Sequence, residues 1–203
     1  MHAQRRHLAA ALVGFPALLA LPVRATGRLR PTPAQTEGPF YPVRAPDDAD
    51  NDLLRNGALH YALGQPVWLR GVVQDTAGRP LHDAQIEIWQ CDEAGHYDHP
   101  GDGSRSHPAF QGFGRMAAQA DGSWAFRTIR PVSYPGRTPH IHAKVRLNGR
   151  TLLTTQLYVD GDPGNARDGI WRRMDPADRA LVTLPFVPVA DGLQAHCTLT
   201  VAT

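Results

Sequence analysis

The sequence predicts an all-β fold, a single β-sandwich of mixed sheets with one or two short helices and long loops. Short stretches of alternating apolar and polar residues recur along the chain, as in Ala84–Gln90, where Ile86 and Ile88 alternate with polar neighbours. The chain also holds 19 glycines and 18 prolines, many of them in turns between these stretches. With 203 residues it is long enough for one domain with a sizeable core.

The first 25 residues have the order of an export signal. Arg5 and Arg6 precede an apolar run over Leu8–Leu21, and Val23–Ala25 offers a small-residue cleavage site. The paired arginines favour the twin-arginine type. The apolar run is short for a membrane span and is interrupted by a glycine and a proline. We therefore expect cleavage, a periplasmic or extracellular protein and no stable membrane insertion afterwards; an N-terminal membrane anchor is the alternative.

Charge and cysteine content exclude some functions. The formal net charge is +2, and the three arginines of the leader leave the remaining chain near −1. No basic face is left to bind nucleic acid. Cys91 and Cys197 could pair in an oxidising compartment, which the sequence leaves open. Neither has the C-x-x-C spacing of a zinc or redox site.

The first half of the chain begins with irregular segments and continues with strands. Residues 26–36 are expected to form a flexible segment, and Glu37–Pro42 an extended segment with two aromatic residues between prolines. Strands are predicted over Pro66–Val73 and Ala84–Gln90. The loop Cys91–Pro100 then leaves the sheet and carries histidine, aspartate, glutamate and tyrosine side chains.

The second half predicts more strands and one helix. Phe110–Met116 and Ser123–Ile129 are expected to form a hairpin, and Asn148-Gly149 predicts a tight turn before the strand Leu152–Val159. Asn165–Arg179 is the best helical candidate, broken at Pro176. The chain is expected to end with strands over Leu181–Val187 and Ala195–Val201. No internal repeat or linker divides residues 37–203, which we therefore treat as one domain.

A His-x-His pair follows a proline-rich segment in the middle of the chain. Side chains two apart on a strand share a face, so His140 and His142 point the same way and could chelate a metal. The pair alone is weak evidence for a metal. A zinc site would need a third ligand, which His96, Asp98 or His99 could supply.

Four segments in order carry a resemblance to a known family. They are Glu37–Pro42, then Ile86–Gln90 with Gly95–Tyr97, then Thr128–His142, and finally Leu153–Tyr158. Together they resemble the intradiol ring-cleavage dioxygenases, the family of protocatechuate 3,4-dioxygenase and catechol 1,2-dioxygenase. The resemblance covers residues 36–165, which is most of the chain after the leader.

The resemblance implies a non-haem Fe(III) site with two tyrosinates and two histidines, which by position are Tyr97, Tyr134, His140 and His142. Phenolate oxygens suit a hard ferric ion, and a bound metal lowers the pKa of its oxygen ligands. By the same resemblance, Arg137 and Gln156 lie near the substrate. A guanidinium there can stabilise negative charge that develops as the ring is attacked. Taken singly, each of these residues has an ordinary structural explanation, and their joint occurrence carries the argument.

The implied reaction is intradiol cleavage of a catechol-type diol by O2, which gives a cis,cis-muconate type dicarboxylic acid. The catalytic residues would be Tyr134, which exchanges a proton with the substrate, Arg137 and Gln156. The chain has no room before Glu37 for the helical dimerisation region of catechol dioxygenases, so it is more similar to the protocatechuate branch. Whether it forms a homo-oligomer or pairs with a second chain stays open. The competing hypotheses are a non-catalytic transthyretin-like β-sandwich binding module and a different metal enzyme that uses the His-x-His pair.

Overall fold

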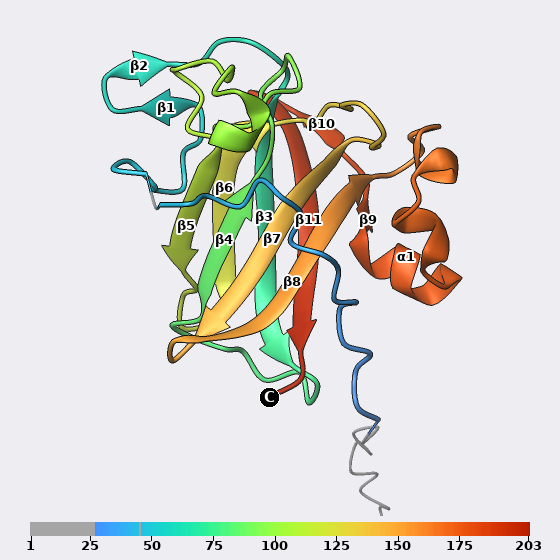
Figure 1. The fold of residues 1–203 in the computed structure, drawn as a ribbon. Helices are drawn as coiled ribbons and strands as arrows, with labels where there is room; N and C mark the ends of the chain where they lie inside the picture. Colours follow the sequence, from blue (N-terminus) through green and yellow to red (C-terminus); the bar gives the residue numbers. More distant parts are fainter. Residues whose placement is uncertain (1–26, 45) are drawn as a thin grey trace, which may run out of the picture.

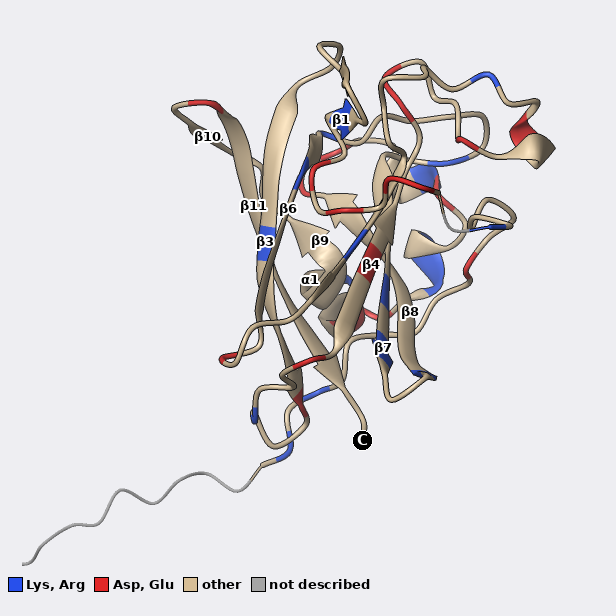
Figure 2. Ribbon diagram, turned by 90° about the vertical axis from the view of Figure 1, so that its left-hand side faces the viewer, with Lys and Arg blue, Asp and Glu red and all other residues tan. Residues whose placement is uncertain are grey.

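The protein is a sandwich of two β-sheets, as the computed structural model of residues 27–44 and 46–203 describes it (Figure 1). The predicted export signal lies outside the described residues. A four-stranded sheet has the order β10-β11-β3-β6, and a five-stranded sheet has the order β5-β4-β7-β8-β9. Figure 2 shows the two sheets as two layers. The β3–β11 and β8–β9 pairs are parallel and the other pairs antiparallel, so the predicted mixed β-sandwich is confirmed.

The strands of the four-stranded sheet are β3 (Pro66–Asp75), β6 (Ser123–Ile129), β10 (Val187–Val189) and β11 (Gly192–Val201). Those of the five-stranded sheet are β4 (Gln85–Trp89), β5 (Phe113–Ala117), β7 (His140–Leu147), β8 (Arg150–Val159) and β9 (Thr183–Leu184). A small ribbon of β1 (Arg55–Asn56) and β2 (Leu59–His60) lies apart from both sheets.

The core lies between the sheets and follows the predicted alternation. On β7, Ile141, Ala143 and Val145 are fully buried and belong to the main apolar cluster. His140 and His142 alternate with them and therefore point to the opposite face of the sheet. They are nevertheless buried, because other parts of the chain cover this outer face.

One cover is a segment that we call the strap, residues 27–42, drawn in blue across β8, β7 and β4 in Figure 1. The sequence predicts flexibility for its first part, but the backbone there bonds to three other segments. The Leu29 N–H donates to the carbonyl oxygen of Thr76, the Thr32 N–H to that of Thr200 and the Gln35 N–H to that of Thr154. Each N···O distance is 2.8 Å. These bonds fix the strap where it reaches the outer face of the five-stranded sheet.

Two predictions about elements are wrong. The predicted hairpin of β5 and β6 does not form, because β5 pairs with β4 and β6 pairs with β3, so the turn between them carries the chain from one sheet to the other. Met116 of β5 and Trp124 and Phe126 of β6 thereby pack in the main core from opposite sheets. By contrast, the Asn148-Gly149 turn between β7 and β8 is confirmed, with φ angles of 50° and 75°.

The helical prediction over Asn165–Arg179 is the second correction. The segment forms two single-turn 3-10 helices, η2 (Asn165–Arg167) and η3 (Trp171–Arg173). The α-helix α1 (Pro176–Val182) starts at the proline that was expected to break it. Proline suits the first turn of a helix because its missing N–H would have no partner there, and Asp175 caps the Asp178 N–H. The predicted strand over Leu181–Val187 is accordingly reduced to β9 and the start of β10.

Both cysteines are free and buried. Cys91 packs in a small cluster with Trp89, Tyr97 and Phe113, whereas Cys197 belongs to the main core. Among the described residues, no helix has the length and apolar character needed to cross a membrane.

Candidate metal centre

The two histidines of β7 bring their ring nitrogens together on the covered outer face. The Nε2 atoms of His140 and His142 are 3.2 Å apart, and the two residues are 1% and 2% exposed. In the antiparallel register with β8, His142 faces Gln156 and His140 faces Tyr158. The predicted shared face of the His-x-His pair is therefore confirmed by the geometry.

The ring of His140 is fixed by a hydrogen bond. Its Nδ1 lies 2.7 Å from the carbonyl oxygen of Thr138, so Nδ1 carries the proton and donates it. This tautomer leaves the Nε2 lone pair directed toward His142. Burial, assisted by the charge of Arg137, lowers the pKa of His140 to about 4, so the imidazole is neutral near pH 7.

The ring of His142 is fixed by stacking. It lies parallel to Trp89, with ring centroids 4.7 Å apart and planes at 10°. Its Nδ1 is buried and has no hydrogen-bond partner in the described structure. Burial and the neighbouring His140 hold its pKa well below the usual value. Both imidazoles are thus neutral, the form in which histidine binds a metal.

Two tyrosines from separate loops complete the group. Tyr97 follows β4, and Tyr134 lies between β6 and β7. The ring centroids of Tyr97 and Tyr134 are 5.5 Å apart, those of Tyr134 and His140 also 5.5 Å, and those of Tyr97 and His142 6.0 Å. All four predicted ligands therefore surround one position.

The two phenols differ in their surroundings. The Tyr97 hydroxyl is buried without a hydrogen-bond partner among the described residues, and burial raises its pKa well above the ordinary value. Tyr134 is half-buried; burial also raises its pKa, while the adjacent charge of Arg137 acts in the opposite direction. A buried hydroxyl without a partner is costly in a folded protein, and a bound cation at this position would satisfy it.

The residues present fit a hard cation. Two neutral imidazoles and two phenols converge, and a bound metal ion would stabilise the phenolates that it needs as ligands. Across residues 27–44 and 46–203, no three His, Cys, Asp or Glu side chains gather to hold a metal. The proposed third zinc ligands instead organise their own loop. His99 Nδ1 accepts from the Gly101 N–H at 2.9 Å, and His96 lies 3.4 Å from Asp102.

Asp92 shapes the loop that carries Tyr97. Its carboxylate accepts from the N–H groups of Ala94, His96 and His107 at 2.8 to 3.0 Å. Gly95 takes a φ of 82°, in the left-handed region that favours glycine. Phe40 of the strap then covers the Tyr97 ring, with centroids 4.6 Å apart and planes at 22°.

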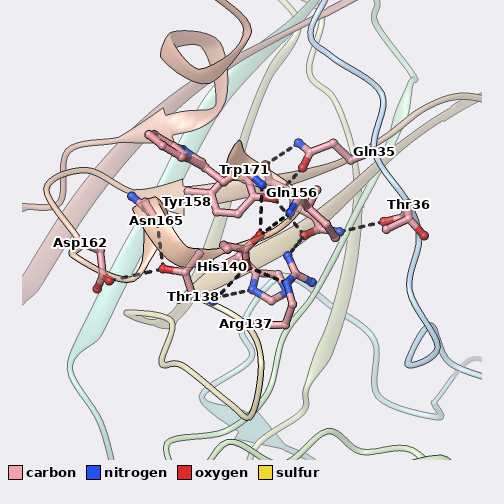
Figure 3. A network of polar contacts seen from close by, with 12 residues as sticks. Gln35, Thr36, Arg137, Thr138, His140, Gln156, Tyr158, Asp162, Asn165 and Trp171 are labelled. Carbon is pink, nitrogen blue, oxygen red and sulfur yellow. Dashed lines mark hydrogen bonds and ion pairs between the residues drawn. The ribbon is translucent and has the colours of Figure 1, made fainter. Parts of the chain in front are cut away.

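Arg137 and Gln156 lie together beside the four rings. One terminal nitrogen of Arg137 donates to Gln156 Oε1 (Figure 3). Arg137 Nε donates to Asp168 Oδ2 at 2.8 Å. Gln156 is fully buried, and its Nε2 donates to the Thr36 carbonyl of the strap at 2.9 Å. A cavity of about 500 Å³ lined by Tyr134 and Arg137 opens next to this network.

Sequence reasoning missed several residues of this neighbourhood. Asp168, Tyr158 and Gln35 belong to the hydrogen-bond network of Arg137 and Gln156, and Phe40 and Trp89 stack on proposed ligands. Phe40 and Trp89 lie in the segments that carry the family resemblance, and this resemblance could have indicated that they belong to the site. Nothing in the pattern around Asp168 distinguishes it from an ordinary turn aspartate.

Comparisons with known proteins show what the chain is similar to. The family model described as Dioxygenase matches residues 36–184. The chain is 32% identical over 158 residues to hydroxyquinol 1,2-dioxygenase of Nocardioides simplex, which covers 69% of this chain and 51% of that protein. It is 34% identical over 154 residues to the protocatechuate 3,4-dioxygenase beta chain of Burkholderia cepacia. This match covers 69% of this chain and 66% of that protein.

Among solved structures, the dioxygenase domain of a dioxygenase–carbohydrate-binding fusion from Streptomyces sp. SirexAA-E is similar over 86% of this chain and 99% of that one. The TM-score is 0.69 and the sequence identity 33%. The chain spans about half the length of the hydroxyquinol dioxygenases that it matches.

Proposed function

The chain belongs to the intradiol dioxygenase family, and from this premise we propose that it cleaves catechol-type diols with O2 at a non-haem Fe(III) centre. The product would be a dicarboxylic acid of the cis,cis-muconate type. The observation that carries the proposal is the convergence of Tyr97, Tyr134, His140 and His142 from three separate segments.

In this proposal the four residues hold the iron, His140 and His142 through neutral Nε2 atoms and Tyr97 and Tyr134 through phenolate oxygens. Ferric iron, when bound, supplies the Lewis acid and redox chemistry that activates the diol toward O2. The protein holds the donors in place before binding, because the two histidines are fixed by Thr138 and Trp89.

Tyr134 is the better placed of the two tyrosines to exchange a proton with the substrate. It lines the cavity of about 500 Å³, whereas Tyr97 is buried beneath Phe40. Burial raises the pKa of Tyr134, but the charge of Arg137 opposes this and a bound metal ion would stabilise the phenolate, whose Oη could then accept a proton from a diol hydroxyl as the diol enters.

Arg137 provides positive charge at the same cavity. A guanidinium fixed before the reaction stabilises negative charge that develops on the ring oxygens. Gln156 holds that guanidinium through Oε1, which is oriented by the bond from Nε2 to the strap. The cavity volume lies in the range of about 300 to 1,000 Å³ found for small-molecule sites.

We also propose that residues 1–25 direct export and that residues 37–203 form one catalytic domain outside the cytoplasm. The order of arginines, apolar run and small residues supports the first part. N-terminal sequencing of the protein recovered from the periplasm or medium should find a start near residue 26. A protein retained in the cytoplasm with an intact leader would refute the export proposal.

The test of function combines colour with oxygen uptake. Tyrosinate bound to Fe(III) absorbs in the visible, so the iron-loaded protein should be red to burgundy. Oxygen uptake should occur with at least one of catechol, hydroxyquinol, protocatechuate or a substituted catechol, with a muconate-type product identified by mass spectrometry. Tyr61→Phe, which removes a buried hydroxyl outside the group, should keep the colour. A protein that stays colourless after ferric loading would contradict the proposal.

A further inference from the structure

Asp168 is a buried carboxylate beside the site, and the proposed reaction gives it no role so far. Its side chain is 0% exposed, and it ends the 3-10 turn η2. Each oxygen accepts two hydrogen bonds. Oδ1 accepts from the N–H groups of Ile170 and Trp171 at 2.8 and 3.1 Å, and Oδ2 accepts from Arg137 Nε and the Thr138 N–H at 2.8 and 3.1 Å. A carboxylate with four donors around it has one stable orientation.

The contacts of Oδ2 decide where Arg137 points. The guanidinium is planar, so fixing two of its nitrogens fixes the direction of the third. Asp168 holds Nε, and Gln156 Oε1 holds one terminal nitrogen. Arg137 lines the cavity together with Tyr134, and its charge acts on the adjacent Tyr134 phenol. The positive charge of Arg137 is therefore held at the wall of that cavity, where a ligand would meet it.

The same carboxylate also touches the backbone that orients a proposed metal ligand. Thr138 donates its N–H to Asp168. Its carbonyl oxygen accepts the Nδ1 proton of His140 (Figure 3). Asp168 thus contacts both Arg137, which lines the cavity, and the next residue, Thr138, which fixes the His140 tautomer.

Electrostatics argue for the same role. Arg137 is only 16% exposed, so its charge needs a partner inside the protein. Asp168 is its only ion-pair partner among the described residues. An asparagine would keep the shape but lose the charge. It would also turn its NH2 group either toward two backbone N–H donors or toward Arg137, and either orientation breaks half of the contacts.

We propose that Asp168 is a positioning residue that aims the guanidinium of Arg137 at the bound diol. This proposal rests on the proposed function, because it assigns Arg137 a partner in the reaction. Asp168 also lines the cavity, but its side chain is 0% exposed and both of its oxygens already accept hydrogen bonds, so it acts through Arg137.

The first test compares Asp168→Asn with Asp75→Asn in the iron-loaded protein. Asp75 is a matched control far from the site. It is 3% exposed, accepts two backbone N–H bonds and pairs with Arg79. We expect kcat to fall at least about tenfold in Asp168→Asn while KM for the diol changes little, because the lost interaction belongs to the transition state. Iron content and visible absorption should stay at the wild-type level, and kcat of Asp75→Asn should be unchanged. A kcat of Asp168→Asn equal to that of Asp75→Asn would overturn the proposal.

A double variant distinguishes an effect of Asp168 on the position of Arg137 from a general structural effect. If Asp168 acts through Arg137, then Asp168→Asn should change kcat less than about twofold in a chain that already carries Arg137→Gln. An equal further loss in that background would refute the proposal. Should Asp168→Asn fail to fold, Arg137→Lys tests the same claim, because lysine keeps the charge but lacks the planar fork. Its kcat should also fall about tenfold, and a wild-type value would count against the proposal.

A readout independent of turnover distinguishes this proposal from the proposed function. In the protein loaded with diamagnetic Ga(III), the Arg137 Nε–H resonance should exchange slowly with solvent in wild type and Asp75→Asn, and rapidly in Asp168→Asn. Equal exchange rates would overturn the positioning role even if the enzyme is active. If no diol is cleaved by wild type while the exchange rates differ as expected, the proposed function fails and the Asp168 contact stands.

Discussion

The proposed metal centre has two halves that are built differently. His140, His142 and Gln156 stand on the paired strands β7 and β8, where the register fixes their spacing. Tyr97 and Tyr134 come from loops and are placed by contacts that span the chain, such as the stack of Phe40 on Tyr97. The strand half is therefore rigid by backbone geometry, whereas the loop half is rigid only while its side-chain contacts persist.

This difference places structure and chemistry in separate parts of the molecule. Ladder hydrogen bonds hold the histidines as a pair even when neighbouring loops move. Proton exchange needs a donor that can move, and the half-buried Tyr134 stands in the loop half. The predictions below test whether the halves behave as this comparison implies.

The largest effect is expected in the strand half. His142→Ala removes a proposed ligand that no neighbour can replace. Affinity for Fe(III) should therefore fall at least about 100-fold, more than the roughly 10- to 100-fold loss typical of residues that only orient a ligand. Iron content after ferric loading and gel filtration measures this. His96→Ala, a histidine of the Tyr97 loop outside the group, should bind iron normally. Full iron content in His142→Ala would show that the ligand assignment is wrong.

The next effect is expected from the tyrosines of the loop half. Tyr134→Phe should shift the visible band and slow turnover roughly 100-fold, because a group that exchanges protons is lost. Iron should remain bound by the other three residues. Tyr97→Phe should also shift the band, but turnover should fall less, since Tyr97 does not line the cavity of Tyr134. Spectra and oxygen uptake on matched iron content check this. Equal kcat values for the two variants would contradict the division of roles.

A smaller effect should separate site from fold. Phe40→Leu removes the stack on Tyr97, and an aromatic pair contributes about 0.5 to 1.5 kcal/mol. Iron affinity should therefore fall by up to about tenfold with little change in the urea midpoint. Ile141→Val, behind the histidines in the core, should cost about 0.5 to 1.5 kcal/mol of unfolding free energy and leave iron binding unchanged. The reverse pattern would show that the strap supports the fold more than the site.

The smallest effect concerns the two thiols. Burial raises the pKa of Cys91 and of Cys197 to about 12, so each should react with iodoacetamide only after the chain opens around it. Cys91 packs beneath the loop half, and Cys197 lies between the sheets. Local opening should expose Cys91 first, and iron should slow its labelling without affecting Cys197. Mass spectrometry of labelled peptides measures both rates; equal rates insensitive to iron would remove the distinction between the halves.

The strand half could be predicted from residue patterns, because a strand has a fixed period of two. That period placed His140 and His142 on one face, and Asn148-Gly149 predicted the turn that pairs β7 with β8. The loop half could not be derived in this way. Tyr97 and Tyr134 are 37 positions apart, and only the family resemblance joined them.

Other features depended on tertiary contacts without a local signal. Pro176 is compatible both with breaking a helix and with starting one, and the cap by Asp175 decided the outcome. The turn between β5 and β6 resembles a hairpin turn, but the two strands do not pair with each other. β5 pairs with β4 in one sheet and β6 pairs with β3 in the other. Asp168 could not be distinguished from other turn aspartates, because its partner Arg137 is 31 residues away.

The parallel pairing of β11 with β3 also has a consequence for the order in which the molecule can be assembled. The pair matches Gly71 with Cys197, so the centre of one sheet joins strands that are 126 residues apart. During synthesis, all four proposed iron ligands are therefore made before β11, the strand that closes the core. Folding through so distant a contact is slow, and metal capture should follow completion of the chain instead of guiding it. A chain that stops before Gly192 would carry all the chemistry and have no stable sandwich to hold it.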